Sequence, residues 1–121
     1  MDEQKAKQIA ALNDQFRFNF FVPTFGPRPV PGHIVCTRGI SGLPPETQIH
    51  IWSAVSEFSD FTADDIHGEH DFGAIRMEDV PEKIFWKIDY YADKSCALGA
   101  EDPSDATRSF RVLTIMLASE Y

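Results

Sequence analysis

The chain has 121 residues, of which 43% are hydrophobic and 25% charged, and its net charge is −8. This size and composition fit a single globular domain over residues 1–121. The ten phenylalanines exclude disorder of the whole chain. The 11 basic residues against 19 acidic ones exclude a general nucleic-acid binder, because binding to a phosphate backbone depends on Lys and Arg.

No apolar run approaches the roughly 20 residues that span a bilayer. Residues 1–16 carry acids and an amphipathic pattern in place of an apolar signal core. Cys36 and Cys96 can form at most one disulfide, so nothing indicates an oxidising compartment. We therefore expect a soluble, cytoplasmic protein.

The first predicted element is a helix over residues 2–15. Ile9, Leu12 and Phe16 recur at the spacing of one helical face. The acids near its start suit the positive end of the helix dipole.

An extended arm at about 17–32, rich in proline and phenylalanine, is predicted next. Four prolines within nine residues remove backbone donors and prevent a regular helix: Pro23, Pro27, Pro29 and Pro31. The phenylalanines of the arm either pack on the core or leave an exposed patch through which the chain could oligomerise. Packing on the core is the favoured alternative.

A short strand over 33–38 and a helix at about 44–58 follow. The segment HIVCTR is rich in β-branched residues, as strands are. Two prolines suit the first turn of the helix, and Ile49, Trp52 and Val55 form an apolar stripe along it.

The segments 71–77 and 83–91 both alternate between apolar and polar residues. With the loop EDVPE between them, they predict a β-hairpin. The C-terminal segment fits both a strand and one face of a helix; Asp105 is a suitable N-cap, so we predict a helix over 106–119. Together these elements predict an α+β domain, with a small, mainly antiparallel sheet and two to three helices packed on one face.

The predicted hairpin register places Met77 opposite Lys83. One face, expected to be the core side, then sets Phe72, Ala74 and Arg76 opposite Ile88, Trp86 and Ile84. The other face sets Glu69, Asp71 and Gly73 opposite Tyr91, Asp89 and Lys87. Acids that face each other across a hairpin destabilise it unless a cation lies among them.

This register suggests a metal site. The candidate ligands are His67, Glu69, His70, Asp71 and Asp89. Three carboxylates beside Lys87 suit Mg²⁺ or Mn²⁺ in a metal-dependent hydrolase or nuclease, although Lys87-Ile88-Asp89 reverses the order found in restriction-type nucleases. The two histidines with Glu69 would instead suit Zn²⁺. In the plainer alternative, these side chains cap backbone groups or pair with Arg76, Lys87 and Arg108.

Several other chemistries lack their motifs. His67-Gly68-Glu69 matches the first half of a zinc-deaminase pattern, but the Pro-Cys-x-x-Cys half is absent. A phosphate-binding Gly-x-x-x-x-Gly-Lys, a Gly-x-Ser-x-Gly elbow and a His-Glu-x-x-His helix are also absent. Apart from the divalent metal of the hydrolase alternative, we expect no cofactor.

The charge concentrates in residues 57–82, which carry nine of the 19 acids and one base, Arg76. The acids are Glu57, Asp60, Asp64, Asp65, Glu69, Asp71, Glu78, Asp79 and Glu82. Such a segment suits a basic protein surface, a cation or solvent. We expect it to bind a basic partner surface, as a mimic of nucleic acid, and we expect no direct binding to nucleic acid or membrane.

Five stretches carry a family resemblance: LNDQFR, LPPE, HGEHDFG, FWKIDYY and RVLTIMLASEY. Together they resemble a family of small bacterial proteins known as domain of unknown function 3768, over most of the chain except the Pro-rich arm. The resemblance implies no established activity. Proteins of this kind look like accessory cargo of plasmids and other mobile elements. Small acidic proteins of such elements often block host defence systems, so we expect a non-catalytic inhibitor of a host defence protein, of the anti-CRISPR or anti-restriction type.

Overall fold

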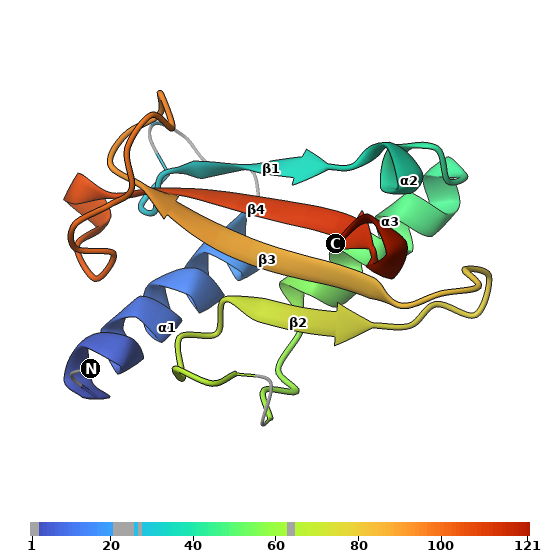
Figure 1. Cartoon of the computed structure of the whole chain (residues 1–121), viewed down its shortest axis with the longest axis horizontal. Helices are drawn as coiled ribbons and strands as arrows, with labels where there is room; N and C mark the ends of the chain where they lie inside the picture. Colours follow the sequence, from blue (N-terminus) through green and yellow to red (C-terminus); the bar gives the residue numbers. More distant parts are fainter. Residues whose placement is uncertain (1–2, 21–25, 27, 63–64) are drawn as a thin grey trace.

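One mixed sheet organises the part of the chain that the structure describes (Figure 1). The structure is a computed structural model that describes residues 3–20, 26, 28–62 and 65–121. Its elements are α1 (Glu3–Asn19), β1 (Gly32–Cys36), α2 (Arg38–Ser41), α3 (Pro45–Ser56), β2 (Phe72–Ile75), β3 (Ile84–Tyr91), a 3-10 turn (Ala106–Arg108), β4 (Phe110–Leu117) and a second 3-10 turn (Ala118–Glu120). The strand order is β1-β4-β3-β2; β1 runs parallel to β4, and the other neighbours are antiparallel. The predicted α+β class with a mainly antiparallel sheet is confirmed.

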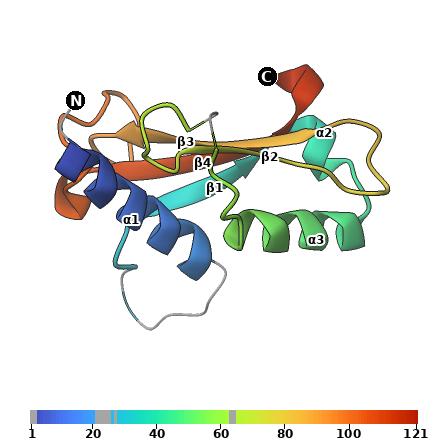
Figure 2. The ribbon, with the colours of Figure 1, turned by 90° about the horizontal axis from the view of Figure 1, so that it is seen from below.

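The core lies between the sheet and the two longer helices. Figure 2 shows α1 and α3 on the same face of the sheet. Alternate side chains of the two central strands point to that face and are fully buried, among them Trp86, Leu113 and Ile115. They pack with Phe16 of α1 and Ile51 of α3. Burial of this apolar surface, at about 25 cal/mol per Å², is the main force that holds the layers together.

Neither of the two longer helices covers the other face of the sheet, and the C-terminal 3-10 turn lies over one end of it (Figure 2). Its side chains, such as Phe85, Lys87 and Val112, are half-buried. At one corner the ring of Tyr121 lies 5.6 Å from that of Phe85 and 6.2 Å from that of Phe72. We call this surface the open face.

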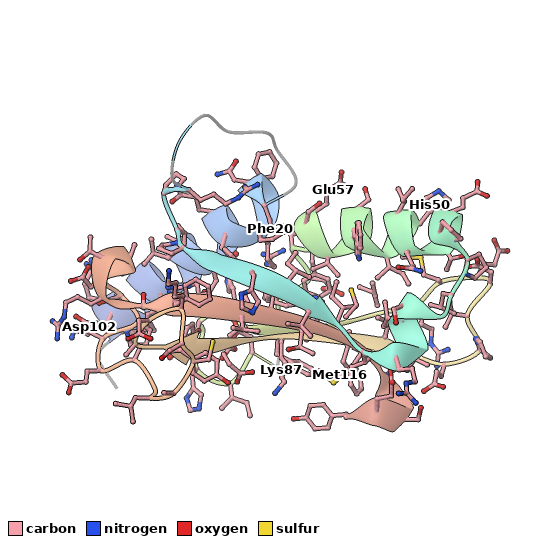
Figure 3. All side chains as sticks on the ribbon, turned by 90° about the horizontal axis from the view of Figure 1, so that it is seen from above. Phe20, His50, Glu57, Lys87, Asp102 and Met116 are labelled. Atoms are coloured by element: carbon pink, nitrogen blue, oxygen red, sulfur yellow. The ribbon has the colours of Figure 1, made fainter. Side chains whose placement is uncertain are left out.

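β1 forms one edge of the sheet, as Figure 3 shows from the side of that edge. The strand matches the predicted strand over 33–38 closely. The short helix α2 that follows it was not predicted. Its first turn is held by the C-terminal 3-10 turn, where Glu120 Oε2 accepts the N–H of Gly39 at 2.9 Å.

The predicted C-terminal helix over 106–119 is wrong. Asp105 does accept the N–H of Thr107, but it caps only a single 3-10 turn. The residues beyond it form β4, one of the two central strands, which pairs with β1 on one side and β3 on the other. The ladder bonds to two neighbours outweigh a local helix signal, since strand formation depends strongly on tertiary context.

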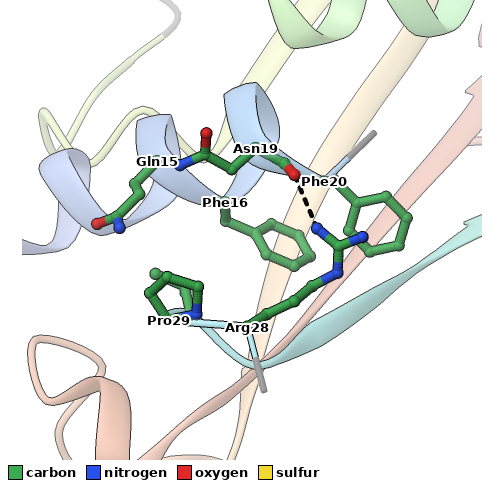
Figure 4. A pocket seen from close by; sticks show the side chains of 7 residues that line it. Gln15, Phe16, Asn19, Phe20, Arg28 and Pro29 are labelled. Carbon is green, nitrogen blue, oxygen red and sulfur yellow. Dashed lines mark hydrogen bonds between the residues drawn. The ribbon is translucent and has the colours of Figure 1, made fainter. Parts of the chain in front are cut away.

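The predicted first helix is confirmed, but its predicted end is too early. α1 continues to Asn19, so the arm does not begin at residue 17. Past the helix end, Arg28 Nη1 donates to the Asn19 carbonyl oxygen at 2.7 Å, and the Arg28 guanidinium lies 5.0 Å from the centre of the Phe20 ring (Figure 4). A cation at the last carbonyl stabilises a helix end.

Phe20 packs on the core, whereas Phe18 is exposed. The other two phenylalanines of the arm, Phe21 and Phe25, lie outside the described residues.

The hairpin is confirmed, but its register differs from the prediction by one residue. Gly73 lies opposite Trp86 and Phe72 opposite Lys87, because the connection between the strands is the longer segment 76–83. A one-residue slip moves every side chain of β2 to the other face. The core side therefore receives Gly73, where a Cβ would lie 2.4 Å from Nε1 of Trp86. Glycine leaves the space that the indole ring fills.

Candidate functional site

The acidic segment leaves the alternating pattern of a strand just before β2. Gly68 and His70 have φ angles of 68° and 56°, in the left-handed region. The chain therefore turns at these residues, and β2 begins at Phe72, so the strand does not reach back to His67. Glu69 and His70 consequently point in different directions from Asp71.

His70 belongs to a contact with α1. Its ring is stacked on Phe61 at a centroid distance of 3.8 Å, and Nδ1 lies 2.9 Å from Oδ1 of Asp14. Asp65, whose side chain is 7% exposed, accepts the backbone N–H of His70 at 3.2 Å. Asp65 thus shapes the turn and is not presented to a partner.

Asp14 also binds Arg17, a buried cation of α1. Nη2 of Arg17 lies 2.8 Å from Asp14 Oδ1, and Nη1 donates to the carbonyl oxygens of Val55 and Phe58 at 2.7 and 3.0 Å. The guanidinium thereby caps the C-terminal end of α3, where the helix dipole is negative. Burial lowers the pKa of Arg17, and the hydrogen bond to Asp14 opposes that effect.

A second buried arginine joins α1 to the sheet. Arg111 on β4 is fully buried, and burial lowers its pKa. Nε donates to Oδ1 of Asn13 at 2.6 Å, Nη1 to the Ser109 hydroxyl at 3.0 Å, and Nη2 to the Pro103 carbonyl oxygen at 2.7 Å. Because all three nitrogens donate, the charge is accommodated inside the protein.

The same network binds Glu69, which the sequence placed on an outer patch. Asn13 Nδ2 donates to the Glu69 carbonyl oxygen at 2.9 Å and to the Tyr90 hydroxyl at 2.8 Å. The Tyr90 hydroxyl donates in turn to Oε1 of Glu69 at 2.9 Å, and burial raises the pKa of Tyr90. Glu69 is 7% exposed. It lies on the helix-covered face with Tyr90, so the predicted pairing with Tyr91 is wrong.

Three of the remaining acids meet along α3. A groove of about 700 Å³ runs between α3 and the turn at residues 76–79. We call it the α3 groove; its ionisable lining residues are Glu46, His50, Glu57, Arg76, Glu78 and Asp79. His50 and Glu57 lie on the side of α3 that faces away from the sheet (Figure 3).

A hydrogen bond joins the two sides of the α3 groove. The hydroxyl of Thr47 on α3 donates to Oδ2 of Asp79 on the turn. This bond, together with the backbone N–H of Asp79 and the nearby His50, lowers the pKa of the Asp79 carboxyl. The side chains of Glu46, Glu57 and Glu78 are exposed, and in the described part of the chain no ion pair engages them.

The other acids of the segment are dispersed. Asp60 is exposed just beyond α3. Glu82 accepts the N–H of Ser119 at 2.8 Å and so fixes the C-terminal turn. Asp64 lies outside the described residues. The segment is therefore not one continuous patch: part of it forms the α3 groove, and part of it serves the fold.

Asp71 and Asp89 line a hollow of about 410 Å³ on the open face, together with His67 and Lys87. Lys87 Nζ lies 3.1 Å from Asp89 Oδ2. Burial raises the pKa of Asp71, as do the charges of Glu69 and Asp65, while His67 opposes them. Of the predicted metal ligands, Glu69 and His70 lie elsewhere. Within residues 3–20, 26, 28–62 and 65–121, no group of three His, Cys, Asp or Glu side chains is arranged to hold a metal ion.

Sequence reasoning missed Glu46 and His50 as members of the groove. Both lie on the predicted helix at 44–58, and Glu46 is in its first turn, so the sequence indicated their positions on a helix. It did not indicate the tertiary contact that brings the 76–79 turn against α3. Asn13 and Arg111 were also missed, since 98 positions separate them in the chain.

Comparison with known proteins identifies a family. The profile of a family described as "Protein of unknown function (DUF3768)" matches residues 36–120. The stretch LNDQFR lies before this match, in α1. No curated protein and no solved structure matches the chain. Among the described helices, none has both the length and the apolar character needed to cross a membrane. The chain belongs to the DUF3768 family.

Proposed function

We propose that this protein is a non-catalytic binding protein that holds a basic surface of a partner protein in the α3 groove. The observation that carries the proposal is the set of exposed carboxylates along one groove: Glu46, Glu57 and Glu78. Carboxylates exposed to solvent in a groove attract cationic surfaces and speed their association.

The location of the positive charges strengthens this proposal. Arg17 and Arg111 are buried and bound to internal groups, so they do not present cations to a partner. In the groove itself, Arg76 and His50 face four carboxylates. The field at the groove is consequently negative.

A basic surface that binds nucleic acid is the partner class that such a groove fits best, because rows of carboxylates resemble rows of phosphates in charge. Binding there would block access of nucleic acid to the partner. The proposed biological role is inhibition of a host defence protein, of the anti-CRISPR or anti-restriction type, by an element that carries this protein.

The test uses two triple variants with equal changes of charge. The groove variant carries Glu46→Gln, Glu57→Gln and Glu78→Gln; the control carries Glu3→Gln, Asp89→Asn and Glu101→Gln, all outside the groove. Each immobilised protein is used to capture host proteins at low salt, with elution by rising salt. We expect the wild type and the control to retain the same basic nucleic-acid-binding protein, and the groove variant to lose it.

Competition completes the test. Duplex DNA or RNA added to the wild-type complex should release the captured partner, because both ligands would use the same basic surface. Equal loss of capture in both triple variants, or a captured partner that keeps its nucleic acid bound, would contradict the proposal.

A metal-dependent hydrolase is the second candidate, and one observation favours it: Asp71, Asp89 and Lys87 line the same hollow on the open face. Isothermal titration with Mn²⁺ should then show binding that Asp71→Asn removes. Absence of Mn²⁺ binding by the wild type would end this alternative, whereas it would leave the groove proposal intact.

A further inference from the structure

The outer side of β1 is a free edge of the sheet. β1 has a single neighbour, β4. Figure 3 looks onto this edge, and no described helix or loop passes in front of the strand. The edge strand of a sheet presents a row of backbone N–H and C=O groups to which another extended chain can add.

Two hydrogen bonds show which backbone groups of β1 point outward. The Arg111 N–H donates to the Pro31 carbonyl oxygen at 3.0 Å, and the Thr37 N–H donates to the Ile115 carbonyl oxygen at 3.1 Å. Alternate residues of a strand direct their backbone groups to the same side, so the odd-numbered residues face β4. The outward set is Gly32, Ile34 and Cys36. Among the described strands β1 pairs with β4 alone, so no strand bonds the N–H and C=O groups of these three residues, and none of the described turn and loop bonds uses them.

The charge of this edge contrasts with that of the rest of the molecule. No acid occurs between Asp14 and Glu46 in the sequence. His33 on β1 and Arg38 on α2 are exposed within this acid-free stretch. The edge therefore suits an extended chain with acidic side chains, whereas the α3 groove repels one.

One carboxylate from another element does approach the end of β1. It is that of Glu120, and both of its oxygens are engaged: Oε1 accepts from the Thr37 hydroxyl at 2.6 Å, and Oε2 accepts from the Gly39 N–H at 2.9 Å. These bonds lower the pKa of Glu120. Its charge is thus committed to the first turn of α2.

A second copy of the chain is a poorer occupant of the edge. If β1 of one copy paired with β1 of another, two edges of the same local charge would be paired, and two molecules of net charge −8 would be joined. Charge complementarity favours an acidic segment of a different protein.

We propose that the β1 edge binds an extended acidic segment of a partner protein, which adds to the sheet as a fifth strand beside β1. The outward groups of Gly32, Ile34 and Cys36 supply the backbone hydrogen bonds. On the open face, the exposed side chains of His33 and Val35 lie beside the added strand and contact its alternate side chains. This surface is separate from the α3 groove and does not depend on it.

The first experiment uses the full chain and a short synthetic peptide of alternating Thr and Glu, blocked at both ends. Binding is followed by NMR with isotope-labelled protein. We expect shift changes and slower amide exchange at Gly32, Ile34 and Cys36. The same peptide with alternate backbone nitrogens methylated should bind at least about tenfold more weakly, because each lost hydrogen bond weakens binding. A peptide with Lys in place of Glu should also bind more weakly.

A pair of variants tests the same contact from the protein side. Ile34→Pro removes one outward N–H and keeps the bonds to β4, whereas Ile34→Ala truncates the side chain and retains that N–H. We expect Ile34→Ala to bind the Glu peptide and Ile34→Pro to lose most of that binding. If Ile34→Pro does not fold, the methylated peptide on the wild-type chain decides the question.

Four results would overturn the inference. They are absence of binding by the Glu peptide, equal binding by the methylated peptide, equal binding by the Lys peptide, and shift changes located away from β1. Sedimentation that shows self-association, abolished by Ile34→Pro, would replace the acidic partner by a second copy.

Discussion

The polar groups beneath α1 and those along the α3 groove are both rich in charge, but they differ in what surrounds them. Beneath α1, Arg17 and Arg111 are buried, and each makes hydrogen bonds to several named partners. Along the groove, Glu57 and Glu78 are exposed and face water. Charge inside this protein thus fixes the helices on the sheet, whereas charge outside remains available for binding.

The largest expected effect is at the centre of the buried network. Arg111→Ala should lower the free energy of unfolding by about 3–5 kcal/mol, because it removes the positive charge that interacts electrostatically with Glu69 and leaves Asn13 without its donor. Urea denaturation measures this loss. Arg108→Ala, which removes an exposed arginine paired with Glu101, is the control and should change stability by less than about 1 kcal/mol. Similar losses in both variants would show that the buried and the exposed arginine contribute equally to stability.

Asn13→Ala should cost about 2–3 kcal/mol, since it leaves several buried groups without partners. These groups are Nε of Arg111 and the Glu69 carbonyl oxygen, and the Tyr90 hydroxyl loses one of its two bonds. Gln8→Ala, an exposed position on the same helix, is the matched control. If both substitutions have equal effects in urea, the network is not what holds α1 in place.

Asp71 permits a prediction of pH dependence. Its pKa is raised in the folded protein, first of all by burial, so the folded state favours the protonated form. The contribution of Asp71 to stability is therefore fully present below its unfolded pKa, about 3.9, and is lost as the pH rises through the folded value. Asp71→Asn should stabilise the protein at pH 7.

Thermal unfolding of Asp71→Asn and wild type between pH 3 and pH 8 provides the measurement. The advantage of the variant should shrink as the pH falls, because the wild-type carboxyl becomes neutral as well. Asp89→Asn, on the same hollow, serves as a comparison. A variant that is less stable than the wild type at pH 7 would show that the charge of Asp71 is stabilised rather than penalised.

The smallest effect on stability is expected in the α3 groove. Glu57→Gln and Glu78→Gln should each change the free energy of unfolding by no more than about 0.5 kcal/mol, as surface substitutions without partners do. The same variants should weaken binding to a basic partner. A large loss of stability in either one, measured in urea, would mean that the groove acids serve the fold as the buried ones do.

Local pattern predicted most of the elements, and tertiary contacts explain where it failed. The helix at 44–58 and the two strands of the hairpin have signals within a single window, and all three are present. β4 was predicted as a helix because its pairing partners are far away in the sequence. The register of β2 depended on how Trp86 fits over Gly73, which no alternation reveals.

The candidate site was predictable in composition but not in arrangement. The acid-rich segment 57–82 included Glu57, Glu78 and Asp79, which line the groove. It also included Glu69 and Asp65, which serve internal bonds. The left-handed turn at Gly68 and His70 separates the acids that form internal bonds from those that line the groove. The alternation of apolar and polar residues in a strand does not indicate such a turn.

The family match begins at residue 36, yet the buried network begins with Asn13, Asp14 and Arg17 in α1. A recombinant fragment trimmed to residues 36–120 would lack nearly all of β1 and every α1 donor and acceptor. Arg111 would then lose its Asn13 acceptor, and the end of α3 would lose its capping cation. The family profile thus covers less of the chain than the buried network does, and we expect a fragment that begins before α1 to be more stable than one that begins at residue 36.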